Sequence, residues 1–187
     1  TRIGSPYVIE AMNQYVEDNY AAVAGYEANG GFLLATPIRR NDSILTALPT
    51  RDAIIVLLTL IHSSVEQSCT ISQLLERLPQ RFTYSDRLKN FAIEKSQQLI
   101  HRYTQGDDSE NISAIETDFP QLCQSLGAIN QLNTIDGLRV TFENDDIIHF
   151  RPSGNAPEFR CYSESASVEN AQAINAQAMQ RVLELSD

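Results

Sequence analysis

The residues best suited to chemistry in this sequence form one polar stretch, residues 150–160. It reads Phe150-Arg151-Pro152-Ser153-Gly154-Asn155-Ala156-Pro157-Glu158-Phe159-Arg160. Guanidinium groups bind phosphate through paired hydrogen bonds, and hydroxyl and amide side chains add further donors. Glycine allows successive backbone N–H groups to converge on an anion. The stretch therefore predicts an anion-binding loop between two strands. A surface turn remains the alternative, with its arginines paired to Glu158, Asp145 or Asp146.

A second polar loop, residues 25–31, lies between two short apolar runs, residues 21–24 and 32–35. Its carboxylate, Glu27, and its amide, Asn29, are groups that can pair with adjacent hydroxyls of a sugar. A tight turn with a solvated Glu27 is the simpler alternative. The loop alone does not decide between the two.

Composition excludes several classes of function. The formal net charge is −10, which disfavours nucleic acid or an anionic membrane surface as a partner. The longest apolar run, residues 53–61, is far shorter than the roughly 20 residues that cross a bilayer, and the N-terminus shows no signal-peptide pattern. Cys69, Cys123 and Cys161 form no CxxC pair, so neither a disulfide framework nor a thiolate metal site is indicated. We expect a cytoplasmic protein.

Residues 1–79 read as alternating helices and strands that would hold the second loop. Ser5 followed by Pro6 predicts a helix of about ten to fourteen residues. The runs 21–24 and 32–35 predict two strands. Thr50 is expected to cap a second helix, which is apolar nearly all round and so should pack against a sheet. Thr70 and Gln73 form a capping box for a short helix up to residue 78, and a boundary is expected near Pro79.

The remaining chain predicts the sheet that would hold the first loop. Residues 81–85 favour a strand, 94–103 a helix, and the acidic stretch 105–111 a solvated loop. Alternating apolar residues between 138 and 163 predict a β-meander with a turn at 144–145. Asp136-Gly137 is interpreted as a turn entering a strand, because a magnesium site needs several converging oxygens. A final helix, capped by Ser167, should pack on the meander.

Taken as a string, residues 151–160 strongly resemble the phosphate-binding loop in the last domain of the α-D-phosphohexomutase family, Arg-Pro-Ser-Gly-Asn-x-Pro-Glu-x-Arg. Residues 25–31 are similar to the sugar-specificity loop of the family's third domain. There Glu27 stands at the family's glutamate and Asn29 at its serine. Residues 1–8 and 84–88 resemble the bacterial phosphomannomutase branch in particular.

The resemblance implies an α/β plus α+β fold in two parts. Residues 1–75 would be sugar-binding domain 3, of the three-layer α/β type and N-terminally incomplete. Residues 76–187 would be C-terminal phosphate-binding domain 4, a small α+β domain with an antiparallel sheet packed by helices. The implied contacts are Glu27 and Asn29 for the sugar, and Arg151, Ser153, Gly154, Asn155 and Arg160 for the phosphate. No catalytic residue and no metal ligand is expected in this chain.

The implied function is that of the C-terminal substrate-binding part of a phosphomannomutase, an isomerase that interconverts mannose 6-phosphate and mannose 1-phosphate. In the intact parent, domains 1 and 2 would supply a phosphoserine and a Mg²⁺ site, with a bisphosphorylated hexose as intermediate. Those two domains and the hexose phosphate are the expected partners, and this chain alone should be inactive. Two alternatives stay open: a free-standing phosphosugar-binding module without catalysis, and a phosphoglucomutase-type relative.

Overall fold

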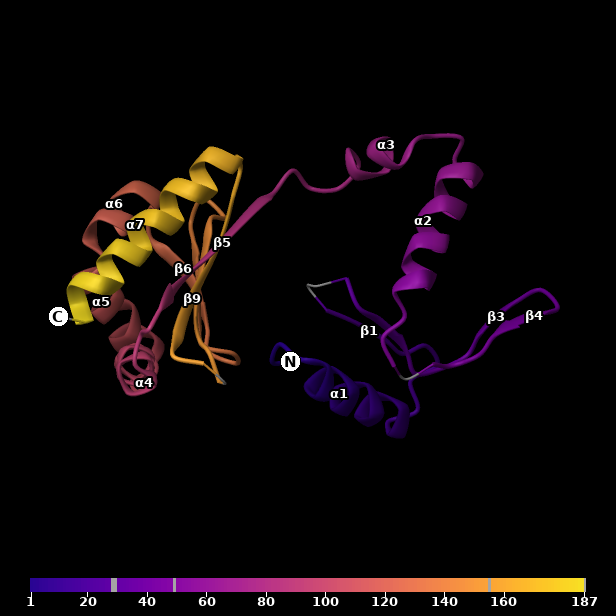
Figure 1. Ribbon diagram of the computed structural model, residues 1–187, viewed down its shortest axis with the longest axis horizontal. Coiled ribbons are helices and arrows are strands. Elements are labelled where there is room, and N and C mark those ends of the chain that lie inside the picture. Colours follow the sequence, from indigo (N-terminus) through magenta and orange to yellow (C-terminus); the bar gives the residue numbers. More distant parts are fainter. Residues whose placement is uncertain (28–29, 49, 155, 187) are drawn as a thin grey trace. The chain divides into compact units, whose positions relative to one another are not determined.

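The computed structural model describes residues 1–27, 30–48, 50–154 and 156–186. The chain forms two compact units, unit 1 from Thr1 to Pro79 and unit 2 from Gln80 to Asp187. Unit 1 is an α/β region, and unit 2 is a five-stranded antiparallel sheet packed with helices (Figure 1). The predicted fold class is confirmed. The assignment of sugar and phosphate binding to residues 1–75 and 76–187 stays a prediction.

Unit 1 begins with helix α1, Ser5–Glu17, which packs on the hairpin of β1, Ala24–Tyr26, and β2, Phe32–Leu34. The predicted helix and strands are present. A Cβ atom at Gly25 would lie 2.5 Å from both Val8 and Met12 on α1, so only glycine lets strand and helix approach this closely. The small core of unit 1 consists of Val8, Met12, Val23 and Leu33.

Two predicted helix caps in unit 1 are wrong. Gly4, not Ser5, is the N-cap of α1, and the Ser5 hydroxyl is used elsewhere. Helix α2, Ala53–Glu66, is capped by Asp52 rather than Thr50, since Asp52 Oδ1 accepts hydrogen bonds from the backbone N–H groups of residues 54 and 55. A carboxylate at this position also interacts favourably with the positive end of the helix dipole. The capping box of Thr70 and Gln73 is confirmed, on a shorter helix α3, Ile71–Leu75.

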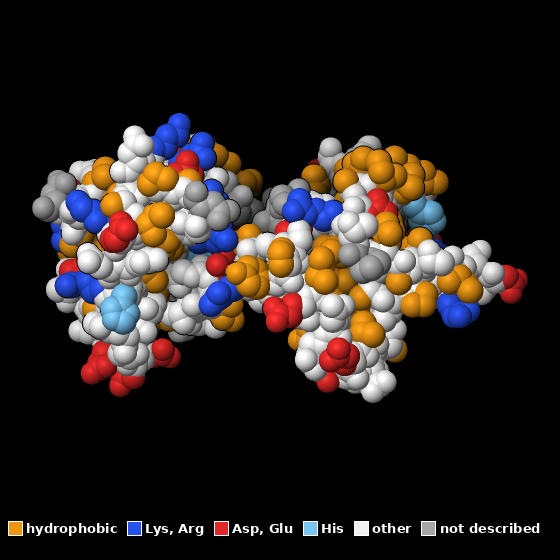
Figure 2. All heavy atoms as spheres, turned by 60° about the horizontal axis from the view of Figure 1, so that its bottom comes forward, with side chains coloured by type: hydrophobic (Ala, Val, Ile, Leu, Met, Phe, Trp, Pro, Cys, Tyr) orange, Lys and Arg blue, Asp and Glu red, His pale blue; other side chains and the backbone are white. Residues whose placement is uncertain are grey.

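The sequence predicts that the apolar surface of helix α2 packs against a sheet, but this surface is not buried. None of its residues is buried. Hydrophobic side chains gather over it instead (Figure 2). The side chains that are more than half exposed are Ile54, Leu57, Leu58, Ile61 and Val65. The two remaining strands of unit 1, β3, Ile38–Arg40, and β4, Ser43–Leu45, form a separate exposed hairpin.

Unit 2 is built on one antiparallel sheet with the strand order β5-β9-β8-β7-β6. Its strands are β5, Phe82–Lys89; β6, Ile129–Asn133; β7, Leu138–Phe142; β8, Ile147–Pro152; and β9, Glu158–Ser165. The predicted meander is confirmed as β7, β8 and β9. Buried and less buried residues alternate along β7 and β9, because successive side chains of a strand point to opposite faces.

Four helices pack on the apolar face of this sheet and leave its polar face uncovered by helices within unit 2 (Figure 1). They are α4, Ile93–Arg102; α5, Asp108–Asp118; α6, Pro120–Leu126; and α7, Val168–Ser186. Ser167 caps α7 as predicted, because its hydroxyl accepts a hydrogen bond from the Asn170 N–H. The buried strand residues of this core include Leu138, Val140, Phe142, Phe150, Phe159 and Cys161.

The predicted solvated loop at residues 105–111 is wrong from residue 108 onward, where α5 begins. Asp107 and Glu110 form a capping box, so the acidic residues that suggested a loop stabilise a helix start instead. None of the described helices combines the length and the apolar character that crossing a membrane requires.

Candidate substrate-binding site

The predicted phosphate loop connects β8 to β9 and is closed by backbone hydrogen bonds. The Ser153 N–H donates to the Glu158 carbonyl at 2.9 Å, and the Glu158 N–H donates to the Ala156 carbonyl at 2.7 Å. From outside the loop, the Phe91 N–H donates to the Pro157 carbonyl at 2.9 Å. Hydrogen bonds therefore hold the loop together and connect it to the segment that follows β5.

Three arginines lie in one row across the polar face of the sheet beside this loop. Arg160 on β9 is the register partner of Arg87 on β5 and of Arg151 on β8. Neighbouring strands of a sheet are about 4.8 Å apart, so the three side chains start from adjacent positions on one face. The sequence predicted the pair Arg151 and Arg160 to lie close together, and the register places them side by side. Arg87 adds a third cation.

Carboxylates of the same unit pair with all three arginines. Glu158 lies 3.3 Å from Arg87 Nη1 and 3.4 Å from Arg160 Nη2. Asp136 Oδ2 accepts a hydrogen bond from Arg151 Nε at 2.7 Å. The alternative of a surface turn predicted that its arginines pair with nearby carboxylates, and Arg160 does pair with Glu158. A cavity of about 290 Å³ lies beside two of the three arginines. It is lined by Ser85, Asp86, Arg87, Arg160 and Tyr162.

The three remaining residues of the predicted phosphate loop are Ser153, Gly154 and Asn155. Ser153 is buried, with 6% of its surface exposed. Gly154 is not among the described residues with positive φ, and a Cβ atom there would meet nothing within 4 Å. The backbone conformation at this point therefore does not require glycine. The absence of a side chain leaves space for a ligand beside the backbone. Asn155 lies outside the described residues.

The predicted sugar loop places Glu27 directly after β1. The Glu27 N–H donates to the Gly31 carbonyl at 2.8 Å, which closes the loop. The Glu27 side chain is only 5% exposed and is not solvated. Its Oε2 atom accepts from Ser5 Oγ at 2.9 Å and lies 2.8 Å from Arg51 Nε. Neither the solvated turn nor an isolated carboxylate describes Glu27, because its buried carboxylate pairs with Arg51, whose own side chain is 54% exposed.

Close packing around this ion pair accounts for one glycine of the loop. A Cβ atom at Gly31 would lie 2.9 Å from Arg51 Cδ and 3.1 Å from Glu27 Oε2. Any larger residue would push against the pair. Asn29, the second predicted sugar contact, lies outside the described residues.

His149 lies on the polar face of the sheet, next to the arginine row. Its Nε2 atom is 2.6 Å from the Asp136 carbonyl, and its ring contacts that of Tyr162. Burial lowers the pKa of His149 below its ordinary value, and the hydrogen bond to Asp136 opposes this in part. Because a carbonyl oxygen can only accept, the Nε2 atom carries the proton and donates it to the Asp136 carbonyl.

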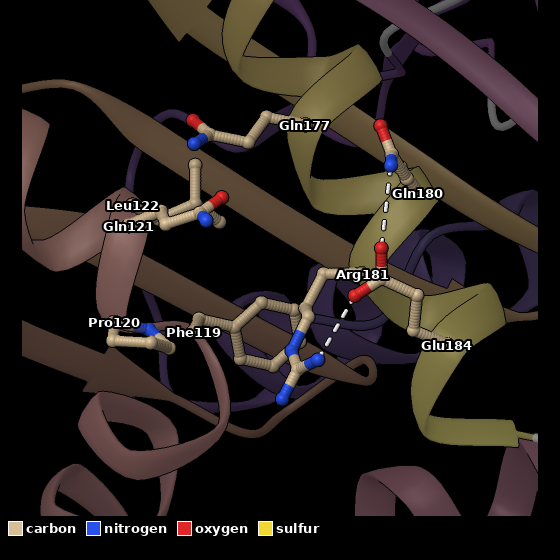
Figure 3. Close-up of a pocket in the computed structure, with 8 residues that line it drawn as sticks. All are labelled: Phe119, Pro120, Gln121, Leu122, Gln177, Gln180, Arg181 and Glu184. Carbon is tan, nitrogen blue, oxygen red and sulfur yellow. Dashed lines mark hydrogen bonds and ion pairs between the residues drawn. The ribbon is translucent and has the colours of Figure 1, made fainter.

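A well-formed cavity of unit 2 lies away from these residues. It measures about 250 Å³ and opens between α6 and α7, with residues of both helices pointing into it (Figure 3). None of the described site residues lines it. Its one arginine, Arg181, already pairs with Glu184 at 2.9 Å and donates to the Asp118 carbonyl. This cavity does not add to the candidate site.

Sequence reasoning missed four residues that contact the predicted ones: Ser5 and Arg51 beside Glu27, Asp136 beside Arg151, and Arg87 beside Arg160. The register of β5 with β9 would have identified Arg87, but that pairing is not visible from local pattern. The local sequence predicts Asp136 only as a turn residue. The same kind of local pattern predicts Ser5 only as a helix cap.

The described residues contain no group of three or more histidine, cysteine, aspartate or glutamate side chains that could hold a metal ion. Asp136, the residue closest to a metal-loop pattern, is paired with an arginine. These residues do not fit a Mg²⁺ site.

Comparison with known proteins finds one matching family model and relatives that align over most of this chain. Residues 1–82 match the family described as phosphoglucomutase/phosphomannomutase, alpha/beta/alpha domain III. A phosphomannomutase of Salmonella muenchen is 43% identical over 175 residues, which are 91% of this chain and 34% of that protein. A phosphomannomutase of Sinorhizobium fredii is 36% identical over 181 residues, which are 96% of this chain and 36% of that protein. The chain thus spans about a third of the length of these relatives.

A solved structure supports the fold. The crystal structure of a phosphoglucomutase/phosphomannomutase family protein from Burkholderia thailandensis superposes with a TM-score of 0.56. The match covers 94% of this chain and 30% of that protein, at 16% sequence identity. At this identity the likeness concerns the fold and not the site.

Proposed function

Since the chain belongs to the phosphoglucomutase/phosphomannomutase family and covers its C-terminal region, we propose that it forms the substrate-binding part of a phosphomannomutase. The reaction is the interconversion of mannose 6-phosphate and mannose 1-phosphate. The observation that carries the proposal is the row of Arg87, Arg160 and Arg151 beside the loop of residues 153–157. A cluster of cations in a chain of net charge −10 favours one local anion site.

In this proposal the loop holds the phosphate that is not being transferred. Arg151 and Arg160 bind its oxygens, and the Ser153 hydroxyl and the backbone N–H groups around Gly154 complete the contacts. Asn155, in the same string, is proposed as a further donor. Such contacts act by positioning the substrate, which is most of what phosphoryl transfer requires of a protein.

Glu27 is proposed to bind the sugar. Arg51 and Ser5 fix its carboxylate through Oε2, and Oε1 would accept a hydrogen bond from a sugar hydroxyl. Asn29 is proposed to contact a neighbouring hydroxyl. An acceptor held in one orientation loses little freedom on binding, which favours discrimination between hydroxyl configurations.

The chemical step needs groups that this chain does not supply. The sequence holds neither a Ser-His-Asn string nor an Asp-x-Asp-x-Asp-Arg string. In the proposal the phosphoserine and the family's Mg²⁺ belong to other domains of the enzyme. This chain contributes binding and orientation of the hexose phosphate.

Titration of the ¹⁵N-labelled chain with inorganic phosphate, mannose 6-phosphate and mannose tests the anion site. The amides of Arg151, Ser153 and Gly154 should shift with both phosphates and not with mannose. Arg151→Ala should weaken phosphate binding by roughly tenfold, as expected for loss of a charge-assisted contact of about 1.4 kcal/mol.

Arg139→Ala is the matched control, because Arg139 lies on β7 of the same sheet and its side chain donates to Thr141 rather than to a loop residue. It should leave phosphate binding unchanged. Absence of shifts up to tens of millimolar phosphate, about the weakest binding that can be assigned, would refute the anion site. Equal weakening by both variants would point to general charge attraction instead of a formed loop.

A free-standing phosphosugar-binding module is the second candidate, favoured by the presence of both predicted binding loops in this chain. Glucose 6-phosphate and mannose 6-phosphate titrations compare the two sugars, and so also address a phosphoglucomutase-type relative. A module of this kind should bind a hexose phosphate with shifts in both loops while showing no mutase turnover. Shifts confined to residues 151–160 would instead favour the role as one part of a larger enzyme.

A further inference from the structure

The turn of Asp136 and Gly137 lies against the end of β8 and contacts two of its residues. Asp136 Oδ2 accepts a hydrogen bond from Arg151 Nε at 2.7 Å, and both side chains are 19% exposed. The backbone carbonyl of Asp136 is 2.6 Å from His149 Nε2. Asp136 thus contacts two residues on the same face of β8, Arg151 and His149. Arg151 is the first residue of the predicted phosphate loop.

Gly137 makes this approach possible. Its φ is +89°, in the region that favours glycine. A Cβ atom there would lie 2.2 Å from the Phe150 carbonyl oxygen and 3.2 Å from Arg151 Cα. No other residue fits without moving the turn away from β8. The Asp136-Gly137 sequence is therefore suited to bring a carboxylate against Arg151.

The ion pair constrains how Arg151 can bind. An arginine side chain has several rotatable bonds, and it loses rotamer entropy when it is held in one orientation. A carboxylate on the Nε edge fixes the plane of the guanidinium group in advance. A phosphate that binds Arg151 then meets a guanidinium group that is already ordered, so that part of the entropy cost is not incurred on binding.

The same carboxylate also neutralises part of the positive charge beside the loop. This second effect opposes phosphate binding, because the carboxylate and the phosphate are both negatively charged and repel each other. The two effects predict opposite results when Asp136 is removed, so an experiment can separate them.

We propose that Asp136 is a positioning residue for Arg151, which it holds ready for the phosphate, and that Gly137 serves to place it. The proposal rests on the function proposed above, in which Arg151 binds phosphate. Asp136 itself does not contact the ligand.

Removing the carboxylate tests the proposal through phosphate affinity and the NMR signal of Arg151 Nε–H. Asp136→Ala should weaken inorganic phosphate binding by about five- to tenfold, the size expected for one lost orienting contact. The Arg151 Nε–H signal should lose its protection from exchange with water. Asp136→Asn keeps the shape and a weaker neutral hydrogen bond, so its affinity should fall between those of the native chain and Asp136→Ala.

Glu164→Gln is the matched control. It weakens another ion pair of the same sheet, Glu164 with Arg81 at 3.2 Å, and should change neither phosphate affinity nor the Arg151 signal. If the native chain binds no phosphate, the proposed function fails. If the native chain binds phosphate and Arg151→Ala binds it more weakly, unchanged or tighter binding by Asp136→Ala overturns the positioning role alone. Should Asp136→Ala not fold, Asp136→Asn is judged by the same criteria.

Discussion

At the scale of single residues, Glu158 would compete with a bound phosphate for Arg87 and Arg160. It lies 3.3 Å from Arg87 Nη1 and 3.4 Å from Arg160 Nη2. Both distances are longer than a strong charge-assisted hydrogen bond of about 2.8 Å. A phosphate has more acceptor oxygens than a carboxylate, so it can replace Glu158 on Arg160 without leaving the guanidinium unpaired.

Glu158→Gln should therefore tighten phosphate binding. Because Arg87 and Arg160 are both partly exposed, the gain is limited to about 0.5–1 kcal/mol, or two- to fivefold in Kd. Isothermal titration calorimetry with inorganic phosphate at low ionic strength measures it. Asp86→Asn serves as the comparison, since Asp86 borders the same hollow but accepts a hydrogen bond from the backbone N–H of Arg87. Weaker binding by Glu158→Gln would mean that Glu158 orients Arg160 instead of competing for it.

At the scale of elements, the agreement between sequence and structure depended on whether a signal was local. The capping box of Thr70 and Gln73 and the alternation along residues 138–163 act within a few residues, and both were predicted. The pairing of β5 with β9 joins distant segments, so Arg87 could not be placed. Glu27 was identified by resemblance, but its burial against Arg51 depends on a residue further along the chain.

Helix α5 shows how a composition signal can mislead. Asp107 Oδ1 accepts from the Glu110 N–H at 3.0 Å, and Glu110 Oε2 accepts from the Asp107 N–H at 3.2 Å. Acidic residues near a helix start also interact favourably with its dipole. The Asn111 side chain, buried at the same end, bonds to both backbone groups of Gly106. Polarity here marks a capped helix, not a solvated loop.

Asp107→Ala should destabilise unit 2 by about 1 kcal/mol, the usual cost of losing an N-cap. For a domain of roughly a hundred residues this lowers Tm by about 4–8 °C. Circular dichroism melting of the variant measures the shift. Asp108→Ala, at the next position and without a capping role, should lower Tm by less than half as much. Equal shifts in the two variants would attribute the effect to helix-end charge and not to the cap.

At the scale of the whole molecule, the two units differ in how much apolar surface they bury. The core of unit 1 consists of four buried residues, and α2 leaves its apolar side chains exposed. Unit 2 has a far larger core, with Tyr103 and Phe159 fully buried within it. Burial is the main source of stability, so unit 1 should open more readily.

Hydrogen exchange measured by mass spectrometry should show faster exchange in the strands of unit 1 than in β8 and β9. Leu33→Ala, which removes a nearly fully buried side chain at a cost of about 2–5 kcal/mol, should abolish protection in unit 1 and leave unit 2 as it was. Val182→Ala is the reciprocal variant, because Val182 is a buried residue of α7 in unit 2. It should reduce protection in unit 2 and leave unit 1 as it was. Loss of protection in both units from either substitution would show that they unfold together.

The sheet order β5-β9-β8-β7-β6 also has a consequence for the time at which the site forms during synthesis. Arg81, which directly precedes β5, contacts Glu164 on β9, which lies 83 positions further along the chain. A ribosome adds roughly 5–20 residues per second, so β5 leaves it on the order of ten seconds before its partner strand exists. Arg87 can join Arg160 and Arg151 only after that delay. A nascent chain that stops short of β9 therefore presents none of the arginine row in its final register.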